Sequence, residues 1–377
     1  MKSLKIYMLI VTLFTVQCSL FISPAKAQET FSIATLNVDG LPGQIWMFNV
    51  NQEGPKSAGS ERISKYLAAK NCDILCLQEN FNYHWEIWSH LFACYKHDEW
   101  TGGIILEDEK PDYAHLQNFK FKCDGLNMVW KKDIKSANYE RVAWTQNFGK
   151  FSHEFDDMIT KGFRRHELTL PDGSEVVVYN MHMDASSDRD ETKQNDARDR
   201  AARLAQWEQL RESILDKLDT RPVIVAGDMN SYYWRDDFKS KFIDAINATK
   251  RATAADAWIE KCNGGVYPKL GSDKIGDETL DKILYINPID GASITPVSVT
   301  LDKAGYTYEG KPMGDHYPLF ATFSLAKRSA TGISSVHKSN SRTTKIHTLQ
   351  GQHINTPCKG VNIIGTADGT TRKVVVK

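Results

Sequence analysis

Residues 222–231 read "PVIVAGDMNS", an apolar run that ends in a glycine, an acid and an amide. The β-branched residues between Pro222 and Gly227 predict a strand that is buried on both faces. Such strands are typical of α/β folds, which place ligands and chemistry at the carboxyl ends of their strands. Asp228 and Asn230 are therefore the first candidates for a functional site.

Other predicted strands end in the same way. Strands are predicted over residues 30–38, 72–79, 278–286 and 317–325, and a hairpin over residues 164–183 with its turn at Asp172 and Gly173. A single acid at a strand end is usually a cap or a turn residue, but each residue type found here can bind a hard cation, move a proton or hydrogen-bond a phosphate oxygen. The set is Asn37, Glu79, Asn180, His182, Asp228, Asn230, Asp281, Asp315 and His316.

Helices are predicted between these strands. Residues 60–70 have apolar side chains at helical spacing with Ser60 as the N-cap, and residues 196–218 and 236–248 are also helical in pattern. After Ala326 the chain becomes poor in apolar residues and rich in Ser, Thr, Lys and Arg, which indicates a linker. The sequence thus predicts a main body over residues 28–326, followed by a linker and a small β-rich tail within residues 327–377.

The order of these motifs resembles that of the endonuclease/exonuclease/phosphatase superfamily, which includes pancreatic deoxyribonuclease and the neutral sphingomyelinases. The matching segments are "TLNVDGLP", "LCLQE", "YNMHMDA", "AGDMN", "LDKILY" and "GDHYPL", within residues 31–324. The last motif of the family usually begins with Ser, where this chain has Gly314. The resemblance implies an α/β fold of the four-layer sandwich type, with two mixed β-sheets face to face and helices outside.

The resemblance also implies a metal-dependent phosphoric ester hydrolase. Asn37, Glu79 and Asp315 match the metal-binding positions of the family. The implied cofactor is Mg²⁺, with Mn²⁺ or Ca²⁺ as alternatives. A cation with oxygen ligands can neutralise the charge that develops when a phosphodiester is attacked.

Five further residues match catalytic positions of the family. Asp228 and Asn230 match the pair that places the attacking water and holds the phosphate, and His182 matches a histidine that contacts the phosphate. His316 matches the general acid/base, and Asp281 matches the carboxylate that orients it. A histidine held in one tautomer by a carboxylate can exchange protons near neutral pH.

Five further charged residues lie close to these motifs. Asp39 and Asp184 are interpreted as solvated acids of loops. Lys161, Arg164 and Arg165, in "TKGFRRHE", either contact phosphates or form the solvated face of a strand. The sequence leaves this choice open.

The substrate is predicted from the segments that follow the strand ends. Residues 44–49, 81–100 and 231–237 are rich in aromatic side chains, which can meet a membrane interface or stack on unpaired bases. The chain has 47 Lys and Arg residues together and 47 Asp and Glu residues together. It therefore lacks the net positive charge through which proteins bind nucleic acid non-specifically. We therefore favour a phospholipid substrate of the sphingomyelinase or phospholipase C type. The alternatives are a secreted nuclease, a phosphatase of soluble phosphate esters and a non-catalytic surface binding module.

Both ends of the chain carry targeting signals in our interpretation. Lys2 and Lys5, an apolar run and an A-x-A site predict a signal peptide over residues 1–27, with a membrane anchor as the alternative. The order "LQGQ…KGVNII…RKVVVK" in the tail resembles the sorting domains of the type IX secretion system, with a flexible tail as the alternative. We expect a secreted monomer whose partners are a phosphodiester substrate and secretion machinery. Cys72 and Cys76 are expected to be small core residues, and the sequence specifies no disulfide pairing.

Overall fold

Two six-stranded sheets form the body of the chain in the computed structural model, which describes residues 30–45, 48–104, 120–149, 154–186, 193–326, 343–348, 351–366 and 371–376. The first sheet has the order β13 (Ser293–Leu301), β16 (Leu319–Ala326), β1 (Thr30–Asn37), β4 (Ile74–Gln78), β6 (Asn127–Lys131) and β5 (Tyr95–His97). The second has the order β11 (Ala252–Asp256), β12 (Asp281–Pro288), β10 (Val223–Asp228), β9 (Glu175–His182), β8 (Gly162–Thr169) and β7 (Lys135–Ala143).

Each sheet has one parallel pair at its centre and antiparallel pairs on both sides. The parallel pairs are β1 with β4 and β9 with β10. The two central pairs pack against each other across the core, since β1 contacts β10 and β4 contacts both β9 and β10. The carboxyl ends of four buried strands therefore meet at one end of the sandwich.

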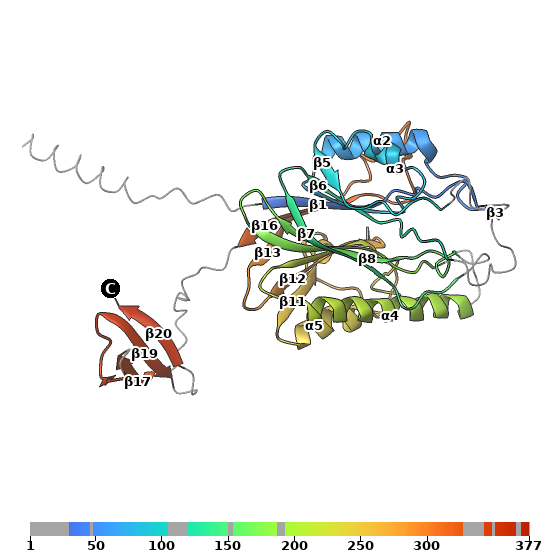
Figure 1. Ribbon diagram of the computed structural model, residues 1–377. Coiled ribbons are helices and arrows are strands. Elements are labelled where there is room, and N and C mark those ends of the chain that lie inside the picture. The colour runs from blue at the N-terminus through green and yellow to red at the C-terminus, as the bar shows by residue number, and fades with distance from the viewer. Residues whose placement is uncertain are drawn as a thin grey trace, which may run out of the picture. The chain divides into compact units, whose positions relative to one another are not determined.

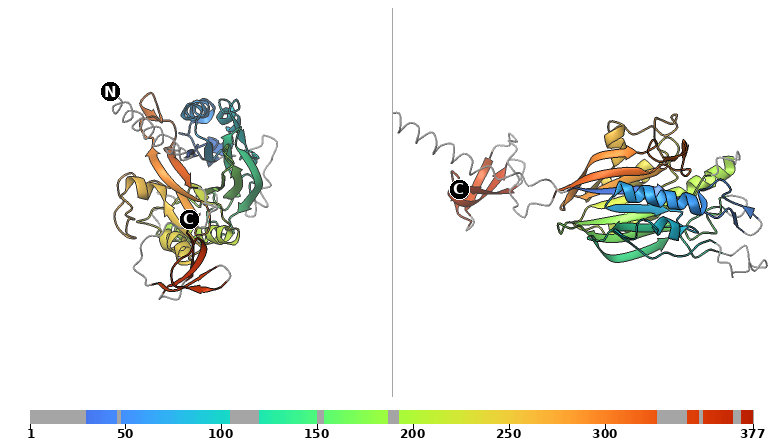
Figure 2. Two further views of the ribbon diagram at one scale, coloured as in Figure 1. Left: turned by 90° about the vertical axis from the view of Figure 1, so that its left-hand side faces the viewer. Right: turned by 90° about the horizontal axis from the view of Figure 1, so that it is seen from above.

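Helices cover the outer faces of both sheets (Figure 1). The helices α2 (Lys56–Lys70) and α3 (His84–Trp88) lie over the first sheet, and α4 (Lys193–Asp216) and α5 (Ala245–Ala248) lie over the second. A π-helical turn (Lys239–Asp244) leads into α5, and α6 (Ala257–Cys262) packs near the edge of the second sheet. Figure 2 gives the same layers from two further sides. The prediction of a four-layer α/β sandwich is confirmed.

Alternation along β1 determines which residues face the site. Ile33 belongs to the apolar core between the sheets, whereas Ala34 and Leu36 belong to the core beneath α2 and α3. Because successive side chains of a strand point to opposite faces, Asn37 projects on the same side as Ile33. The last residue of β1 therefore points toward the second sheet.

The close approach of β9 and β10 depends on a glycine. A Cβ atom on Gly227 would lie 2.0 Å from the carbonyl oxygen of Met181, and its φ is 156°. A side chain here would push the two strands apart, so glycine is required for the pairing that brings their ends to one level.

Several local predictions were wrong or incomplete. Ser60 is not an N-cap: α2 begins one turn earlier, after Pro55, and Ser60 is buried within it. Residues 239–248 form a π-helical turn and a short α-helix instead of one α-helix. The strands β5, β7, β11 and β13 were not predicted. The hairpin turn at Gly173 and the burial of Cys72 and Cys76 are confirmed, and the thiols of Cys72 and Cys76 are free.

The chain divides into two compact units, residues 1–327 and residues 328–377. The described residues of the second unit form an antiparallel sheet in the order β18 (His353–Ile354), β17 (Thr343–Thr348), β19 (Gly360–Thr366) and β20 (Thr371–Val376). Asn362 is buried there and bonds both backbone groups of Cys358, which closes the loop before β19.

Two short hairpins complete the described elements, β2 (Gln44–Ile45) with β3 (Phe48–Asn49) and β14 (Thr307–Tyr308) with β15 (Lys311–Pro312). The predicted signal peptide lies outside the described residues. Among the helices that the structure describes, none combines the length and the apolar character needed to cross a bilayer.

Candidate active site

Three predicted site residues stand in one row across the second sheet. Asp228 of β10 pairs with His182 of β9 on one side and with Asp281 of β12 on the other. Directly paired residues of neighbouring strands project on the same face of a sheet, so the three side chains lie together. All three are at most 3% exposed. We refer to these residues as the row.

His316 approaches the row from the segment before β16. Its Nδ1 lies 2.6 Å from Asp281 Oδ2, and its Nε2 lies 3.6 Å from Asp228 Oδ2. Burial alone would lower the pKa of His316, but the charges of Asp281 and Asp228 raise that pKa well above its ordinary value. Asp228, Asp281 and His316 offer ligand atoms within 4.8 Å of one another. Because both carboxylates already lie against the imidazolium of His316, which offsets part of their charge, we interpret this group as an acid–base cluster and not as a cation site.

A second group of acids includes no cationic side chain among its members. Burial raises the pKa of Glu79 to about 8, and the charges of Asp315 and Asp39 contribute to that rise. Burial and the charge of Asp315 likewise raise the pKa of Asp39 to about 7. Oxygen donors whose charges repel one another suit a hard divalent cation, which removes the repulsion. The acids Asp39, Glu79 and Asp315, which we call the acidic group, are therefore the candidates for holding Mg²⁺ or a similar ion.

Asn37 joins the acidic group to the row. Its Nδ2 donates to Glu79 Oε1 at 3.0 Å and to Asp228 Oδ2 at 3.1 Å, and its Oδ1 accepts a hydrogen bond from the backbone N–H of Asp39. The structure thus places two of the predicted metal positions, Asn37 and Glu79, in contact, and the charges of Asp315 and Asp39 act on Glu79. The prediction of Asp39 as a solvated acid was wrong, since this residue is 7% exposed.

The backbone of the site adopts a left-handed conformation at three non-glycine residues. The φ angles of Asp39, Glu79 and Asn230 are 51°, 52° and 46°. Such angles cost energy and gather at functional sites, where the surrounding structure holds them. Gly40 supports two of them: its N–H binds the carbonyl oxygen of Glu79, and a Cβ on Gly40 would lie only 2.4 Å from that oxygen.

His182 lies between a lysine and an acid. Its Nε2 is 3.2 Å from Lys161 Nζ and 3.4 Å from Asp228 Oδ2, and Lys161 is also ion-paired with Asp156. Burial and the charge of Lys161 hold the pKa of His182 well below its ordinary value, so this histidine is neutral. Its Nδ1 is buried and has no partner in the described structure. Lys161 is 4% exposed, which excludes the solvated face that the sequence left open for it.

Asn230 follows the row and is held by two contacts. Its backbone N–H donates to Asp228 Oδ1 at 3.0 Å, and its side-chain Nδ2 donates to the carbonyl oxygen of Met183 at 3.1 Å. Asp184, predicted to be solvated, is instead fully buried beneath this segment. Burial and the charge of Asp156 raise the pKa of Asp184 to about 9, so it is protonated at neutral pH.

A tyrosine hydroxyl occupies the position next to Gly314. A Cβ added to Gly314 would lie 3.3 Å from Tyr306 Oη and 3.8 Å from Asp39 Cβ. Tyr306 is fully buried, and its hydroxyl has no hydrogen-bond partner in the described structure. The hydroxyl expected to be lost with the family serine is thus replaced nearby by that of Tyr306, which the sequence pattern did not indicate.

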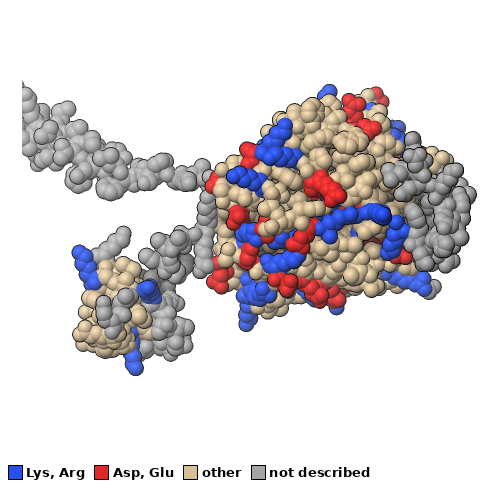
Figure 3. Space-filling model, viewed as in Figure 1, with Lys and Arg blue, Asp and Glu red and all other residues tan. Residues whose placement is uncertain are grey.

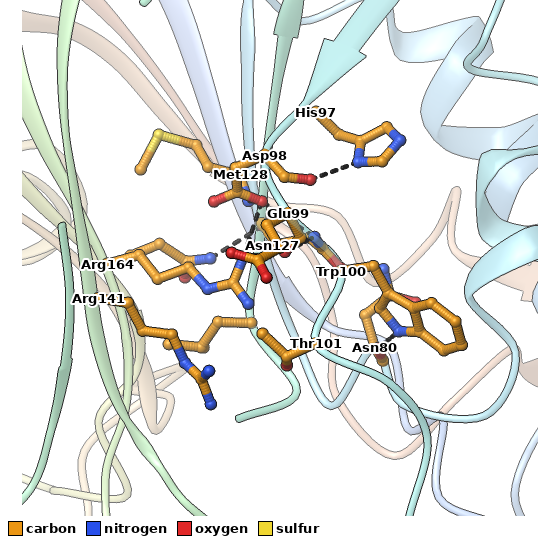
Figure 4. Close-up of polar contacts among 12 residues, drawn as sticks. Asn80, His97, Asp98, Glu99, Trp100, Thr101, Asn127, Met128, Arg141 and Arg164 are labelled. Atoms are coloured by element: carbon orange, nitrogen blue, oxygen red, sulfur yellow. Dashed lines mark hydrogen bonds and ion pairs between the residues drawn. The ribbon is translucent and has the colours of Figure 1, made fainter. Parts of the chain in front are cut away.

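The two arginines of the hairpin do not reach the site. Arg164 is fully buried and binds Asp98, next to which it lies in Figure 4. It also binds Asp124, and both acids come from segments next to the first sheet. Arg165 is buried against Glu140 and Glu167. Both arginines therefore hold the fold together, and neither a phosphate contact nor a solvated face is correct for them.

A comparison with known protein families agrees with this geometry. The model of the endonuclease/exonuclease/phosphatase family matches residues 34–285, which is more than half of the chain. The chain belongs to this family. The match extends from β1 to β12 and so includes the row and most of the acidic group.

Relatives of the endonuclease/exonuclease/phosphatase family differ in what they act on. Sphingomyelinases from Mycobacterium bovis and Mycobacterium tuberculosis are 26% identical over 300 residues, which cover 78% of this chain and 52% of the relative. The chain therefore spans about half the length of these curated relatives.

Solved structures share the fold of this family member. D. rerio TDP2, complexed with a single-strand DNA product, is 17% identical with a TM-score of 0.51, over 78% of this chain and 99% of that chain. An endonuclease/exonuclease/phosphatase from Bacteroides vulgatus is 15% identical with a TM-score of 0.50, over 79% of this chain and 99% of that chain. At these identities the likeness concerns the fold alone.

Proposed function

We propose that this family member hydrolyses a phosphodiester with the help of a divalent cation. The observation that carries the proposal is the joining of the row to the acidic group through Asn37, because it places acid–base groups beside a cation site. A bound Mg²⁺ would be held by the acidic group, where it supplies neutralisation of the charge that develops on the phosphoryl oxygens.

Residues of the chain itself supply the other catalytic functions. Asp228 and Asn230 orient a water molecule whose oxygen forms the new bond to phosphorus while the bond to the leaving oxygen breaks. Asp281 keeps Nδ1 of His316 protonated, which leaves Nε2 as the atom that exchanges a proton with the reacting oxygens. The neutral His182 accepts a hydrogen bond from Lys161 at Nε2, so we assign its Nδ1 N–H, which has no partner in the described structure, to the contact with a phosphoryl oxygen.

We propose a phospholipid as the substrate. The relatives at 26% identity are sphingomyelinases. Trp85 is 63% exposed and Phe92 is 59% exposed, and both follow Glu79 in the chain. Trp85 packs edge-on against Trp100, whose indole N–H binds the carbonyl oxygen of Asn80, the residue next to Glu79. An exposed aromatic ring tied to the site by these contacts suits an enzyme that works at a lipid surface.

The surface charge also supports a lipid over a nucleic acid. On the face shown in Figure 3, Lys and Arg side chains lie among Asp and Glu side chains. The formal net charge is zero. Non-specific binding of nucleic acid depends on an excess of positive charge, which this face does not offer.

Hydrolysis of bis-p-nitrophenyl phosphate with Mg²⁺ or EDTA tests the proposed chemistry. We expect turnover with Mg²⁺ and its loss in EDTA; full activity in EDTA would refute the cation site. The substrate is tested with liposomes of phospholipids that differ in head group, sphingomyelin and phosphatidylcholine among them, and, separately, with plasmid DNA and RNA. Release of a phosphorylated head group with intact plasmid supports a lipid enzyme, whereas rapid nicking without lipid turnover would identify a nuclease.

We further propose that the protein is exported by a signal peptide over residues 1–27 and sorted by its second unit. Support comes from the basic and apolar pattern of the leader and from the order of motifs in the tail. Fractionation of the producing cells tests this proposal. We expect the full chain outside the cell or on its surface and the chain without residues 327–377 in the periplasm.

A further inference from the structure

Two pockets open beside the catalytic residues. The histidine pocket, of about 250 Å³, is lined by His316 and Asp281 of the site and by Tyr232, Lys274, Lys303 and Tyr317. The acidic pocket, of about 740 Å³, is lined by Asp39 and Asp315 and by Arg62 and Tyr308. A diester has two arms, and these two pockets lie where the arms of a diester at the site can be placed.

The tyrosines of both pockets are already in contact with cations of the protein itself. Arg62 lies 4.3 Å from the ring centre of Tyr308, and Lys303 lies 5.9 Å from that of Tyr317. Within about 6 Å, a cation interacts with the ring face. A quaternary ammonium group, such as that of choline, binds proteins chiefly through such faces, so these two rings are poorly available to it.

Two cationic side chains lie against the ring of Tyr232. Lys274 Nζ lies 4.7 Å from its ring centre and 3.3 Å from its hydroxyl oxygen, and the guanidinium carbon of Arg235 lies 5.2 Å from the same ring. A choline group beside this ring would meet the repulsion of both charges. The ring of Tyr232 is therefore poorly available to a cationic head group. The acids Asp277, Glu278 and Asp315 also line the histidine pocket, but Asp277 is paired with Lys303 and Glu278 with Lys282.

Lys274 differs from the other lysine of the histidine pocket. Lys303 is paired with Asp277 at 2.6 Å. Across the described ranges, no carboxylate lies within ion-pair distance of Lys274, whose recorded contacts are with Tyr232. Its charge is thus available to a ligand in a pocket that also contains the proton-exchanging His316.

We propose that the histidine pocket binds a second anionic group of the substrate through Lys274 and disfavours quaternary ammonium head groups. This inference rests on the proposed function and names its substrate class: a phospholipid whose head group carries a phosphate in addition to the scissile one. Phosphocholine esters are then poor substrates.

The test compares small phosphates as competitive inhibitors of bis-p-nitrophenyl phosphate hydrolysis by the full chain in Mg²⁺. The pairs are inositol monophosphate with inositol bisphosphate, thymidine monophosphate with thymidine bisphosphate, and ethyl phosphate with phosphocholine. We expect the second phosphate to lower the inhibition constant about fivefold or more, as a charge-assisted contact does. Phosphocholine should bind no more tightly than ethyl phosphate.

Variants distinguish binding of the second phosphate by Lys274 from its binding by the cation of the proposed metal site, which also attracts bisphosphates. The ratio of inhibition constants within a pair should fall toward one in Lys274→Ala and persist in Lys274→Arg. Lys269→Ala removes an exposed lysine of the same segment that does not line the histidine pocket, and it should preserve both the ratio and the turnover. The ratio should also decrease with salt, because Lys274 is exposed.

Each outcome decides a separate point. Tighter binding of phosphocholine than of ethyl phosphate, or an unchanged ratio in Lys274→Ala, would overturn the inference. A gain for the thymidine pair alone supports the anion subsite and assigns it to a polynucleotide. If bis-p-nitrophenyl phosphate is not hydrolysed, the proposed function fails, and calorimetric titration of the same six compounds still measures the ratios.

Discussion

His316 Nδ1 lies 2.6 Å from Asp281 Oδ2, and this contact connects the start of β12 with the segment that precedes β16. Asp281 is also the residue that pairs with Asp228 in the ladder between β12 and β10. One carboxylate thus completes the row in the second sheet and orients a histidine delivered by the first sheet. The acid–base function depends on the packing of the two sheets against each other.

Replacement of His316 by Ala should lower the turnover of bis-p-nitrophenyl phosphate by about 10²-fold or more, because the proton transfer that it provides is lost. Asp281→Asn should have a smaller effect, since the histidine remains but its tautomer is less well fixed. His90→Ala, which changes an exposed histidine of the same protein, is the control. Unchanged turnover in His316→Ala would remove this residue from the mechanism.

Binding of Mg²⁺ should tighten as the pH rises from about 6 to about 9, because the cation needs ionised ligands and the folded protein raises the pKa of Asp39 to about 7 and that of Glu79 to about 8. Raised pKa values also mean that the metal-free protein loses stability as the pH rises through this range. Mg²⁺ should therefore increase the melting temperature more at the upper than at the lower end. Calorimetry and thermal melts of the wild type and Glu79→Gln measure both effects; a pH-independent affinity would contradict them.

Trp85→Ala should weaken partition into phospholipid vesicles by about tenfold, the amount expected when one large apolar ring no longer enters the interface. Cleavage of a soluble diester should change much less, because Trp85 lies outside the site. Ile289→Ala is a matched control, since Ile289 is 58% exposed but follows the opposite end of β12. Equal vesicle binding by the wild type and Trp85→Ala would argue against membrane contact by this ring.

Arg164→Met should reduce the free energy of unfolding by about 3–5 kcal/mol, because it leaves the carboxylates of Asp98 and Asp124 buried without their shared cation. Urea denaturation measures the change. Lys135→Met, at an exposed position of β7, should lie near the wild type. A similarly small loss in Arg164→Met would mean that other donors satisfy both acids.

A chain that ends at Ala326 should fold and retain catalysis, because every residue of the row and of the acidic group lies in the first unit. Turnover and thermal melting of this shortened chain, compared with those of the full chain, provide the measurement. A soluble, folded product without activity would show that the second unit contributes to the site.

The sequence predicted the parts of the fold whose signals are local. Apolar runs that end in polar residues identified β1, β4, β9, β10 and β12, and with them the row. The burial of Asp39 was not predictable in this way. It depends on the left-handed turn at Glu79 and on the passage of Gly40 against it, which are contacts between segments far apart in the chain.

The edge strands and the ion-pair partners of buried charged residues also could not be predicted from the sequence. The burial pattern of β7 alternates among mostly exposed positions, so it lacks an apolar run, and its pairing with β8 is visible only in the structure. Arg164 looks like a surface residue because nothing in its neighbourhood of the sequence reveals Asp98 or Asp124. A sequence pattern reports apolar faces well and distant ion-pair partners poorly.

The row has a consequence for how this protein can change over time. His182, Asp228 and Asp281 are aligned by strand register, so adding or deleting one residue within β9, β10 or β12 would turn a catalytic side chain to the opposite face. The site is thus tolerant of length changes in the loops that flank α3, which carries Trp85, and in the loop that holds Lys274, and intolerant of them in the central strands. New substrate preferences can arise by insertions in these loops, while the catalytic residues of the central strands keep their positions.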